Sequence, residues 1–331
     1  MDQIVVDLGL SVHERWELHK NHIAPLPGND GGKRLCVVTG IHGDELEGQY
    51  VAFLLNQELQ RHPEYLHGTV DIYPAMNPLG INTIQRGVPL FDLDMNRIFP
   101  GYMQGETTQR IAGALFDAVK GYRYGIHFAS FYLPGDFVPH VRIMDTGYQT
   151  SSLGNLFGLP YVVMRTPKPI DTTTLNYNWQ IWESNAFSIY TRKTAHIDEE
   201  SAAQAVSAVL RYLSRVGVVK YTCHSGYLST VINENDLATV LTPAGGIFRA
   251  LRVPGQEVEY GDRGQQEARR KSAGGYAKGF HDSQGSGVRT QPRHGIQRLY
   301  AVLAENDADR CNRNYLLVLL LQCGKAHHSL L

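Results

Sequence analysis

The stretch Leu35-Cys36-Val37-Val38-Thr39-Gly40-Ile41-His42-Gly43-Asp44-Glu45 decides the fold of this chain. Its first part reads as a buried strand, and the apolar residues that follow at positions 46, 50, 53 and 54 have helical spacing, which predicts a helix over about residues 44–60. A strand that runs directly into a helix is typical of α/β proteins, in which sites form at the carboxyl edges of strands. His42 and Glu45 stand at such an edge.

The same alternation of strands and helices continues to Gly217, which is a plausible helix terminator. A helix is predicted over about residues 107–120, and Asp198 can cap a last helix. The further predicted strands are Val70–Ala75, Tyr124–Ala129, Val141–Met144, Tyr161–Met164 and Ala186–Thr191. We therefore expect a mixed or parallel sheet flanked by helices.

The overall composition is that of a soluble globular protein. Apolar residues make up 43% and charged residues 19% of the 331 residues, and the formal net charge is -1. This balance gives no electrostatic case for a nucleic-acid or membrane partner. Four scattered cysteines, the absence of a signal-peptide pattern and a longest apolar run of only Leu316–Leu321 favour a cytoplasmic protein with no membrane span.

Composition changes after Lys220. Residues 220–262 hold short alternating runs and two Pro-Gly type turns, at 243–246 and 254–255, which predict a small and incomplete antiparallel β module. Residues 263–331 form an irregular basic and apolar tail without periodicity, which is typical of a disordered segment or of a sequence out of its original reading frame. Residues 1–219 are expected to form the main domain.

Three residues have the chemistry of a zinc site. Zinc favours about four ligands from His, Cys and carboxylates, with one position left to water in catalytic sites. His42 and Glu45 lie three residues apart at a strand-to-helix turn and can hold one zinc ion together, and His127 on a later strand offers a third ligand. Because the His-x-x-Glu spacing is common by chance, the prediction depends on the later segments.

Those later segments supply groups for an anionic substrate. A guanidinium at Arg86 beside the metal could polarise a scissile carbonyl and stabilise the oxyanion. Asn96 and Arg97 are neighbours in a predicted loop, and the planar fork of an arginine matches a carboxylate. The order of these residues predicts a zinc-dependent hydrolase whose substrate carries a free carboxylate.

Together these motifs resemble the succinylglutamate desuccinylase/aspartoacylase family, which is related to the zinc carboxypeptidases. The resemblance covers about residues 33–262 and rests on His42-Gly43-Asp44-Glu45, Asn77-Pro78, Arg86, Asp94–Gly101 and Ile126-His127. It implies a zinc-carboxypeptidase-like α/β fold followed by a β barrel-sandwich module. It also implies one zinc per chain on His42, Glu45 and His127, with Arg86 activating the carbonyl and Asn96 and Arg97 holding a substrate carboxylate.

The chain departs from the family pattern at two positions that concern chemistry. Gly125 stands where the family has an Asp two residues before the third ligand, so a group that orients the ligand is missing. Tyr190 stands where the family has the Glu that acts as general base. Glu183, just upstream, is the nearest carboxylate in the sequence and is assigned the role of base.

The resemblance and the residues together predict an N-acyl amino acid deacylase, a zinc-dependent enzyme that cleaves an amide bond. Two alternatives stay open, which are a metallocarboxypeptidase acting on short peptides and a non-catalytic zinc-binding homologue. Tyr190 and the incomplete β module favour the second of these. The oligomeric state, the acyl group and the amino acid of the substrate are not determined by the sequence.

Overall fold

The computed structural model describes residues 2–10, 13, 15–89, 91–131, 136–193 and 195–237 and five short segments, 247–250, 254–256, 265–268, 297–300 and 319–322. The chain divides into two compact units. One consists of Met1–Ser130 and Pro139–Glu234, and the other of Phe131–Val138 and Asn235–Leu331. The predicted site residues all belong to the first unit.

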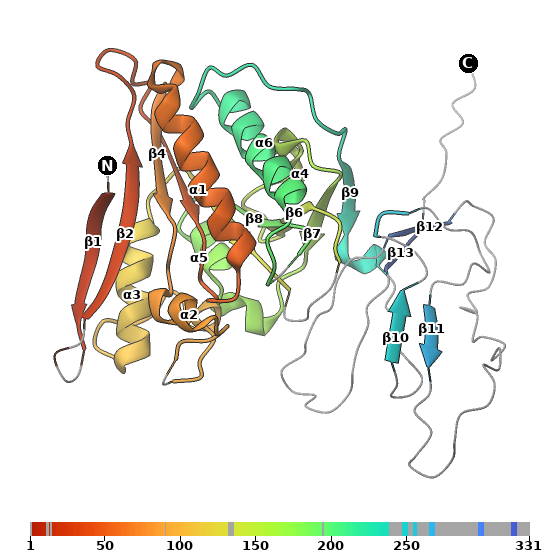
Figure 1. Cartoon of the computed structure of the whole chain (residues 1–331), viewed down its shortest axis with the longest axis horizontal. Coiled ribbons are helices and arrows are strands. Elements are labelled where there is room, and N and C mark those ends of the chain that lie inside the picture. Colours follow the sequence, from red (N-terminus) through yellow and green to blue (C-terminus); the bar gives the residue numbers. More distant parts are fainter. Residues whose placement is uncertain are drawn as a thin grey trace, which may run out of the picture. The chain divides into compact units, whose positions relative to one another are not determined.

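A nine-stranded mixed sheet forms the centre of the first unit (Figure 1). In chain order its strands are β1 (Asp2–Gly9), β2 (Arg15–Ile23), β3 (Lys33–Val38), β4 (Gly68–Tyr73), β5 (Tyr124–Ala129), β6 (His140–Met144), β7 (Tyr161–Arg165), β8 (Asn185–Tyr190) and β9 (Thr230–Asn233). In space the order is β1-β2-β4-β3-β5-β8-β6-β7-β9. The central strands β4, β3, β5 and β8 are parallel, whereas β1, β2 and β6 join their neighbours β2, β4 and β8 in antiparallel pairs.

Helices cover both faces of this sheet. On one face α1 (Leu46–Arg61) and α6 (Glu199–Arg215) lie side by side (Figure 1) and share a hydrophobic core with the sheet. On the other face a second core includes apolar residues of α3 (Thr107–Val119) and α5 (Leu175–Ile181). The shorter elements are α2 (Pro78–Thr83), α4 (Ser151–Gly154) and the 3-10 turns η2 (Pro63–Tyr65), η3 (Met95–Arg97), η4 (Asn155–Phe157), η5 (Pro169–Thr173) and η6 (Glu234–Asp236).

Most elements between residues 33 and 217 agree with the sequence prediction. The strand Tyr124–Ala129 has the predicted bounds, and the helix predicted over 107–120 is α3. Asp198 caps α6 by accepting a hydrogen bond from the backbone N–H of Ser201 at 3.0 Å, as its position indicates. The mixed sheet flanked by helices is therefore confirmed.

The first compact unit extends beyond residues 1–219, over which the sequence predicts the main domain. Strand β9, at Thr230–Asn233, pairs in parallel with β7, and the first unit continues to Glu234 rather than ending at residue 219. Strands β1 and β2 and helix α5 were also not predicted. Helix α5 has only seven residues, and β1 and β2 are the two outermost strands at one side of the sheet, where many residues are half-buried or exposed and the apolar pattern is weak.

In the described part of the second unit, short strands pair, one of them within the predicted β module and three within the predicted irregular tail. Strand β10 (Ile247–Ala250) pairs with β11 (Gln265–Ala268), and β12 (Gln297–Tyr300) pairs with β13 (Leu319–Gln322), both antiparallel. Most of residues 238–331 lies outside the described residues, and so do most of the predicted tail and a part of the predicted β module. The barrel-sandwich module and the altered reading frame stay predictions.

The structure gives a packing reason for Gly125, the first departure from the family pattern. A Cβ at this buried position on β5 would lie 2.8 Å from the indole ring of Trp179 on α5. Trp179 is itself fully buried and donates a hydrogen bond from Nε1 to the carbonyl oxygen of Val119 at 3.0 Å. The indole ring therefore occupies the space that an Asp side chain at position 125 would need.

We expect Gly125→Ala to lower the free energy of unfolding by about 1–3 kcal/mol, because the added methyl overpacks the core against Trp179. Urea unfolding of the purified chain measures the change. Gly9→Ala is the matched control, since a Cβ at Gly9 meets nothing within 4 Å. An equal stability of the two variants would contradict the packing argument.

Candidate active site at the carboxyl edge of the sheet

The predicted ligands meet at one edge of the sheet because β3 and β5 are parallel neighbours. Val38, the last residue of β3, pairs with His127 on β5. The chain leaves β3 at this edge and reaches His42 four residues later. The loop is held to the neighbouring strand and loop by hydrogen bonds from the backbone N–H of Thr39 to Tyr73 O (3.0 Å) and from that of Asn77 to Gly40 O (2.8 Å).

Gly43 lets the loop that carries His42 lie against a second loop. A Cβ at Gly43 would stand 2.0 Å from the carbonyl carbon of Gly80 and 2.4 Å from the carbonyl oxygen of Gln85. Its backbone N–H donates to that oxygen of Gln85 at 3.1 Å. The contact is between backbones, so only glycine fits, and it brings the segment containing Arg86 to the site.

His42 and Glu45 are the buried centre of the site. Nδ1 of His42 lies 2.7 Å from Oε1 of Glu45, and the backbone N–H of His42 donates to Oε2 at 3.2 Å. On its other side, Nε2 of His42 lies 2.7 Å from Oδ1 of Asp94. Ser130 donates to Oε1 of Glu45 from both its backbone N–H (3.1 Å) and its hydroxyl (3.0 Å). Asp94 therefore holds the imidazole of His42, and Ser130 holds the carboxylate of Glu45.

The charges of this centre are coupled. Burial alone would lower the pKa of His42, but the carboxylates of Glu45 and Asp94 overcome it and raise that pKa to about 9. Burial likewise acts to raise the pKa of Glu45, and the neighbouring His42 reverses the effect and lowers it to about 2. The two carboxylates therefore favour the protonated form of His42, and His42 in turn favours the ionised form of Glu45.

His127 has the opposite electrostatic behaviour. Burial is the main cause that lowers its pKa to about 4, although Glu45 acts in the other direction. Its side chain is neutral at pH 7, which is the form that binds a metal. Its Nε2 atom is buried without a hydrogen-bond partner among the described residues. A buried and unsatisfied ring nitrogen beside Glu45 is what a missing ligand or ion would explain.

The donor chemistry of His42, Glu45 and His127 fits a zinc ion. Two imidazoles and a carboxylate are a common catalytic zinc set, and a second nitrogen of a ligating His usually donates to a carboxylate, as Nε2 of His42 does to Asp94. Within the described residues, no three or more His, Cys, Asp or Glu side chains already stand in a metal-holding arrangement. The pair His42–Glu45 has hydrogen-bonded rather than metal-bound geometry.

Arg86 lies at the site as predicted. Its Nη1 atom donates to Oδ1 of Asp44 at 3.3 Å and to the hydroxyl of Ser130 at 3.2 Å. Because that hydroxyl also contacts Glu45, one serine connects the guanidinium to the ligand pair. Arg86 also acts on the pKa values of His42, Glu45 and His127, which places its positive charge near all three.

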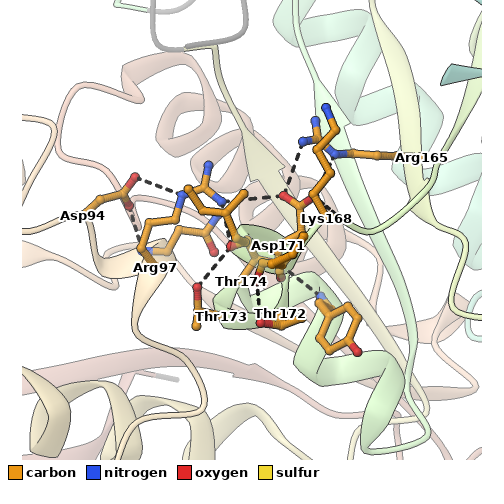
Figure 2. A network of polar contacts seen from close by, with 12 residues as sticks. Asp94, Arg97, Arg165, Lys168, Asp171, Thr172, Thr173 and Thr174 are labelled. Carbon is orange, nitrogen blue, oxygen red and sulfur yellow. Dashed lines mark hydrogen bonds and ion pairs between the residues drawn. The ribbon is translucent and has the colours of Figure 1, made fainter. Parts of the chain in front are cut away.

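Asn96 and Arg97 belong to the turn η3, which Asp94 connects to the site. One carboxylate oxygen of Asp94 accepts from the backbone N–H of Asn96 at 2.8 Å and faces His42, and the other lies 3.9 Å from Nε of Arg97. Figure 2 shows Arg97 with Asp94 on one side and Asp171 on the other. The amide oxygen of Asn96 accepts from the backbone N–H of Leu175 at 3.0 Å. The structure therefore brings both predicted substrate-binding residues toward the ligand pair.

Glu183 is not brought to this site. It precedes β8 at its amino end, where Asn185 pairs with Tyr124, whereas the site lies at the carboxyl end of β5. Its side chain is exposed, and its backbone lies in the left-handed region with φ 62°. Proximity in sequence to Tyr190 was misleading because the length of β8 separates them.

Tyr190 lies at the carboxyl end of β8, beside the site, where the family places its Glu. It pairs with Ala129, the residue before Ser130. The guanidinium carbon of Arg142 lies 4.4 Å from the centre of its ring, and the ring of His140 stacks on it at 4.9 Å. A phenol between a guanidinium and an imidazole thus replaces a carboxylate at this position.

Sequence reasoning missed two residues that hold the ligands. Asp94 stands at the start of the Asp-Met-Asn-Arg segment, and its capping position before η3 was a readable signal. Ser130 lies only three residues after His127, but a lone serine after a strand has no distinctive pattern. Its role follows from the pairing of β5 with β3.

None of the described helices is long and apolar enough to cross a membrane.

Comparison with known proteins identifies the family. The model of the succinylglutamate desuccinylase/aspartoacylase catalytic domain matches residues 31–216, which is more than half of the chain. The chain belongs to this family, and the resemblance carried by its motifs is confirmed. No curated protein matches it.

Solved structures show the same fold at low identity. A succinylglutamate desuccinylase/aspartoacylase from Rhodobacter sphaeroides is 20% identical, with a TM-score of 0.71, over 97% of this chain and 95% of that one. A succinylglutamate desuccinylase from Silicibacter sp. TM1040 is 20% identical, with a TM-score of 0.69, over 83% and 84%. The product-bound ectoine utilization protein EutE (DoeB) from Ruegeria pomeroyi is 20% identical, with a TM-score of 0.67, over 83% and 85%.

We expect Asp94→Ala to lower the free energy of unfolding by about 1–3 kcal/mol, because it leaves buried donors of His42 and Asn96 without their acceptor. Asp94→Asn keeps an oxygen acceptor and should lose less. Urea unfolding of metal-free protein measures both variants.

Asp117→Ala is the control for Asp94, since it removes an exposed carboxylate that only pairs with Lys120 on the surface of α3. If Asp94→Ala and Asp117→Ala unfold alike, the contacts of Asp94 do not stabilise the site.

Proposed function

We propose that this chain is a zinc-dependent deacylase that hydrolyses the amide bond of a small substrate with a free carboxylate, such as an N-acyl amino acid. The observation that carries the proposal is the meeting of His42, Glu45 and His127 with Arg86 at one edge of the sheet. This edge belongs to the region that matches the family's catalytic domain.

His42, Glu45 and His127 would hold one Zn²⁺. When bound, zinc supplies a Lewis acid that polarises a carbonyl and lowers the pKa of water toward about 7. The positive charge of Arg86 stabilises the negative charge that develops on the carbonyl oxygen. Asn96 and Arg97 orient the substrate through its free carboxylate, because a guanidinium fork binds a carboxylate at two points.

A second candidate function is a non-catalytic zinc-binding homologue, and Tyr190 is the observation that favours it. Strand β8 itself carries no carboxylate, and a phenol stands at its carboxyl end, where the resemblance to the family implies the general base. A carboxypeptidase acting on short peptides is a third reading of the same site. A panel of N-acyl amino acids and dipeptides separates the three functions. Turnover of N-acyl amino acids supports the deacylase, turnover of dipeptides supports the carboxypeptidase, and turnover of neither supports the non-catalytic homologue.

We expect purified wild-type protein to carry about one zinc per chain. His42→Ala should lose it, because a site with only two protein ligands binds zinc weakly. Emission spectroscopy of the protein after desalting measures the metal content.

His22→Ala is the matched control for metal binding, as His22 also faces a carboxylate, Asp71, but lies on β2 away from the site. Stoichiometric zinc in the His42→Ala variant would refute the ligand assignment.

We expect Arg86→Ala to lower kcat about 100- to 1,000-fold on the substrate that wild type turns over, because one stabiliser of the oxyanion is lost. Glu183→Gln should leave kcat unchanged, since Glu183 lies at the opposite end of β8. Steady-state kinetics of both variants test the assignment. A loss of activity in Glu183→Gln that matches the loss in Arg86→Ala would return the base to Glu183.

A further inference from the structure

A buried carboxylate outside the predicted site holds two arginines. Asp171 lies in η5 and is 2% exposed. Arg165, at the end of β7, contacts both of its oxygens, with Nε 3.2 Å from Oδ2 and Nη2 3.3 Å from Oδ1. The backbone N–H of Lys168 also donates to Oδ2 at 2.9 Å. The guanidinium of Arg165 and the backbone of Lys168 therefore fix the position of this carboxylate.

Arg97 approaches the same carboxylate from the site. Its Nη1 atom lies 3.6 Å from Oδ1 of Asp171 and donates to the carbonyl oxygen of Ile170 at 3.2 Å. Its Nε atom lies 3.9 Å from Asp94, the carboxylate that faces His42. Figure 2 shows this line of alternating charges from Arg165 to Asp94.

The backbone around Arg97 is held by the same segment. The backbone N–H of Phe99 donates to the carbonyl oxygen of Thr173 at 3.0 Å, and that of Leu175 donates to the side chain of Asn96 at 3.0 Å. Residues 170–175 thus contact the side chain of Asn96, the backbone of Phe99 and the guanidinium of Arg97. Backbone and side chain are oriented by one turn.

We infer that Asp171 is a positioning residue that sets the orientation of the Arg97 guanidinium toward the carboxylate of the substrate. This inference rests on the proposed function, in which Arg97 binds that carboxylate. A free arginine side chain loses rotamer entropy when a ligand orders it. A fixed partner such as Asp171 orders the side chain before the substrate binds, so binding costs less entropy.

Arg165 explains how Arg97 keeps its attraction for an anion although it contacts Asp171. The two-point contact from Arg165 neutralises most of the charge of Asp171, because a bidentate guanidinium–carboxylate pair is the stronger ion pair. The longer single contact to Arg97 then orients its guanidinium without cancelling its charge. Arg165 thus fixes Asp171, and Asp171 orients Arg97.

The test is the binding of N-acetyl amino acids, each beside its neutral carboxamide, measured by calorimetry on the purified full chain. Wild type should bind at least one carboxylate more tightly than the matching carboxamide, and Arg97→Ala should lose this preference. Asp171→Asn should weaken binding of the carboxylate about 10-fold and leave that of the carboxamide unchanged. In turnover assays the same variant should raise KM with kcat nearly unchanged.

The double variant separates positioning from a general effect. If Asp171 acts through Arg97, then Asp171→Asn has no further effect in the Arg97→Ala background. Additive losses, or equal losses for carboxylate and carboxamide, would overturn the inference. An unchanged preference in Asp171→Asn, while Arg97→Ala loses it, overturns this inference alone. If wild type does not prefer the carboxylate over the carboxamide, or if Arg97→Ala keeps this preference, the role of Arg97 is overturned as well.

Two further variants keep the test decisive. Asp71→Asn also neutralises a fully buried carboxylate, which contacts Lys20 and His22. Asp71 lies on β4 away from Arg97, so this variant should leave the preference unchanged. If Asp171→Asn does not fold, Arg165→Lys takes its place, because lysine keeps the charge but loses the two-point hold on Asp171. A reduced preference in this variant supports the inference, and an unchanged preference overturns it.

Discussion

The parallel pairing of β3 with β5 is the constraint on which the site depends. It sets Val38 beside His127 and so brings a histidine from the middle of the chain to the loop that carries His42. The same pairing brings Ser130, just beyond β5, to the carboxylate of Glu45. A shift of one residue in this register would turn His127 to the other face of the sheet, because side chains alternate along a strand.

Buried and half-buried charges of alternating sign connect the site to the segment that follows β7. Glu45, His42 and Asp94 form one end of the series, and Arg97 and Asp171 continue it toward β7. A buried charge is costly unless an opposite charge and hydrogen bonds accompany it. Each member is therefore stabilised by its neighbours, and the turn η3 is connected through Asp94 to His42.

The two departures from the family pattern have different physical meanings. At Gly125 the space of the family's Asp is filled by the ring of Trp179, so packing explains the glycine. At Tyr190 the phenol lies between Arg142 and His140, so a polar cluster stands where a carboxylate is expected. At the first position His42 still contacts a carboxylate, that of Asp94, whereas at the second a phenol replaces the carboxylate that the resemblance implies.

The sequence by itself determined the strand-to-helix turn at residues 35–45, the alternation of strands and helices up to residue 217, the family, and most of the residues that meet at the site. These signals are local or carried by motifs, and apolar periodicity reports on each element separately. Only the tertiary structure decided that Glu183 lies at the far end of β8, that β9 joins the main sheet, and that Asp171 holds Arg97. Contacts between residues 74 positions apart depend on strand order and register, which no local pattern of residues contains.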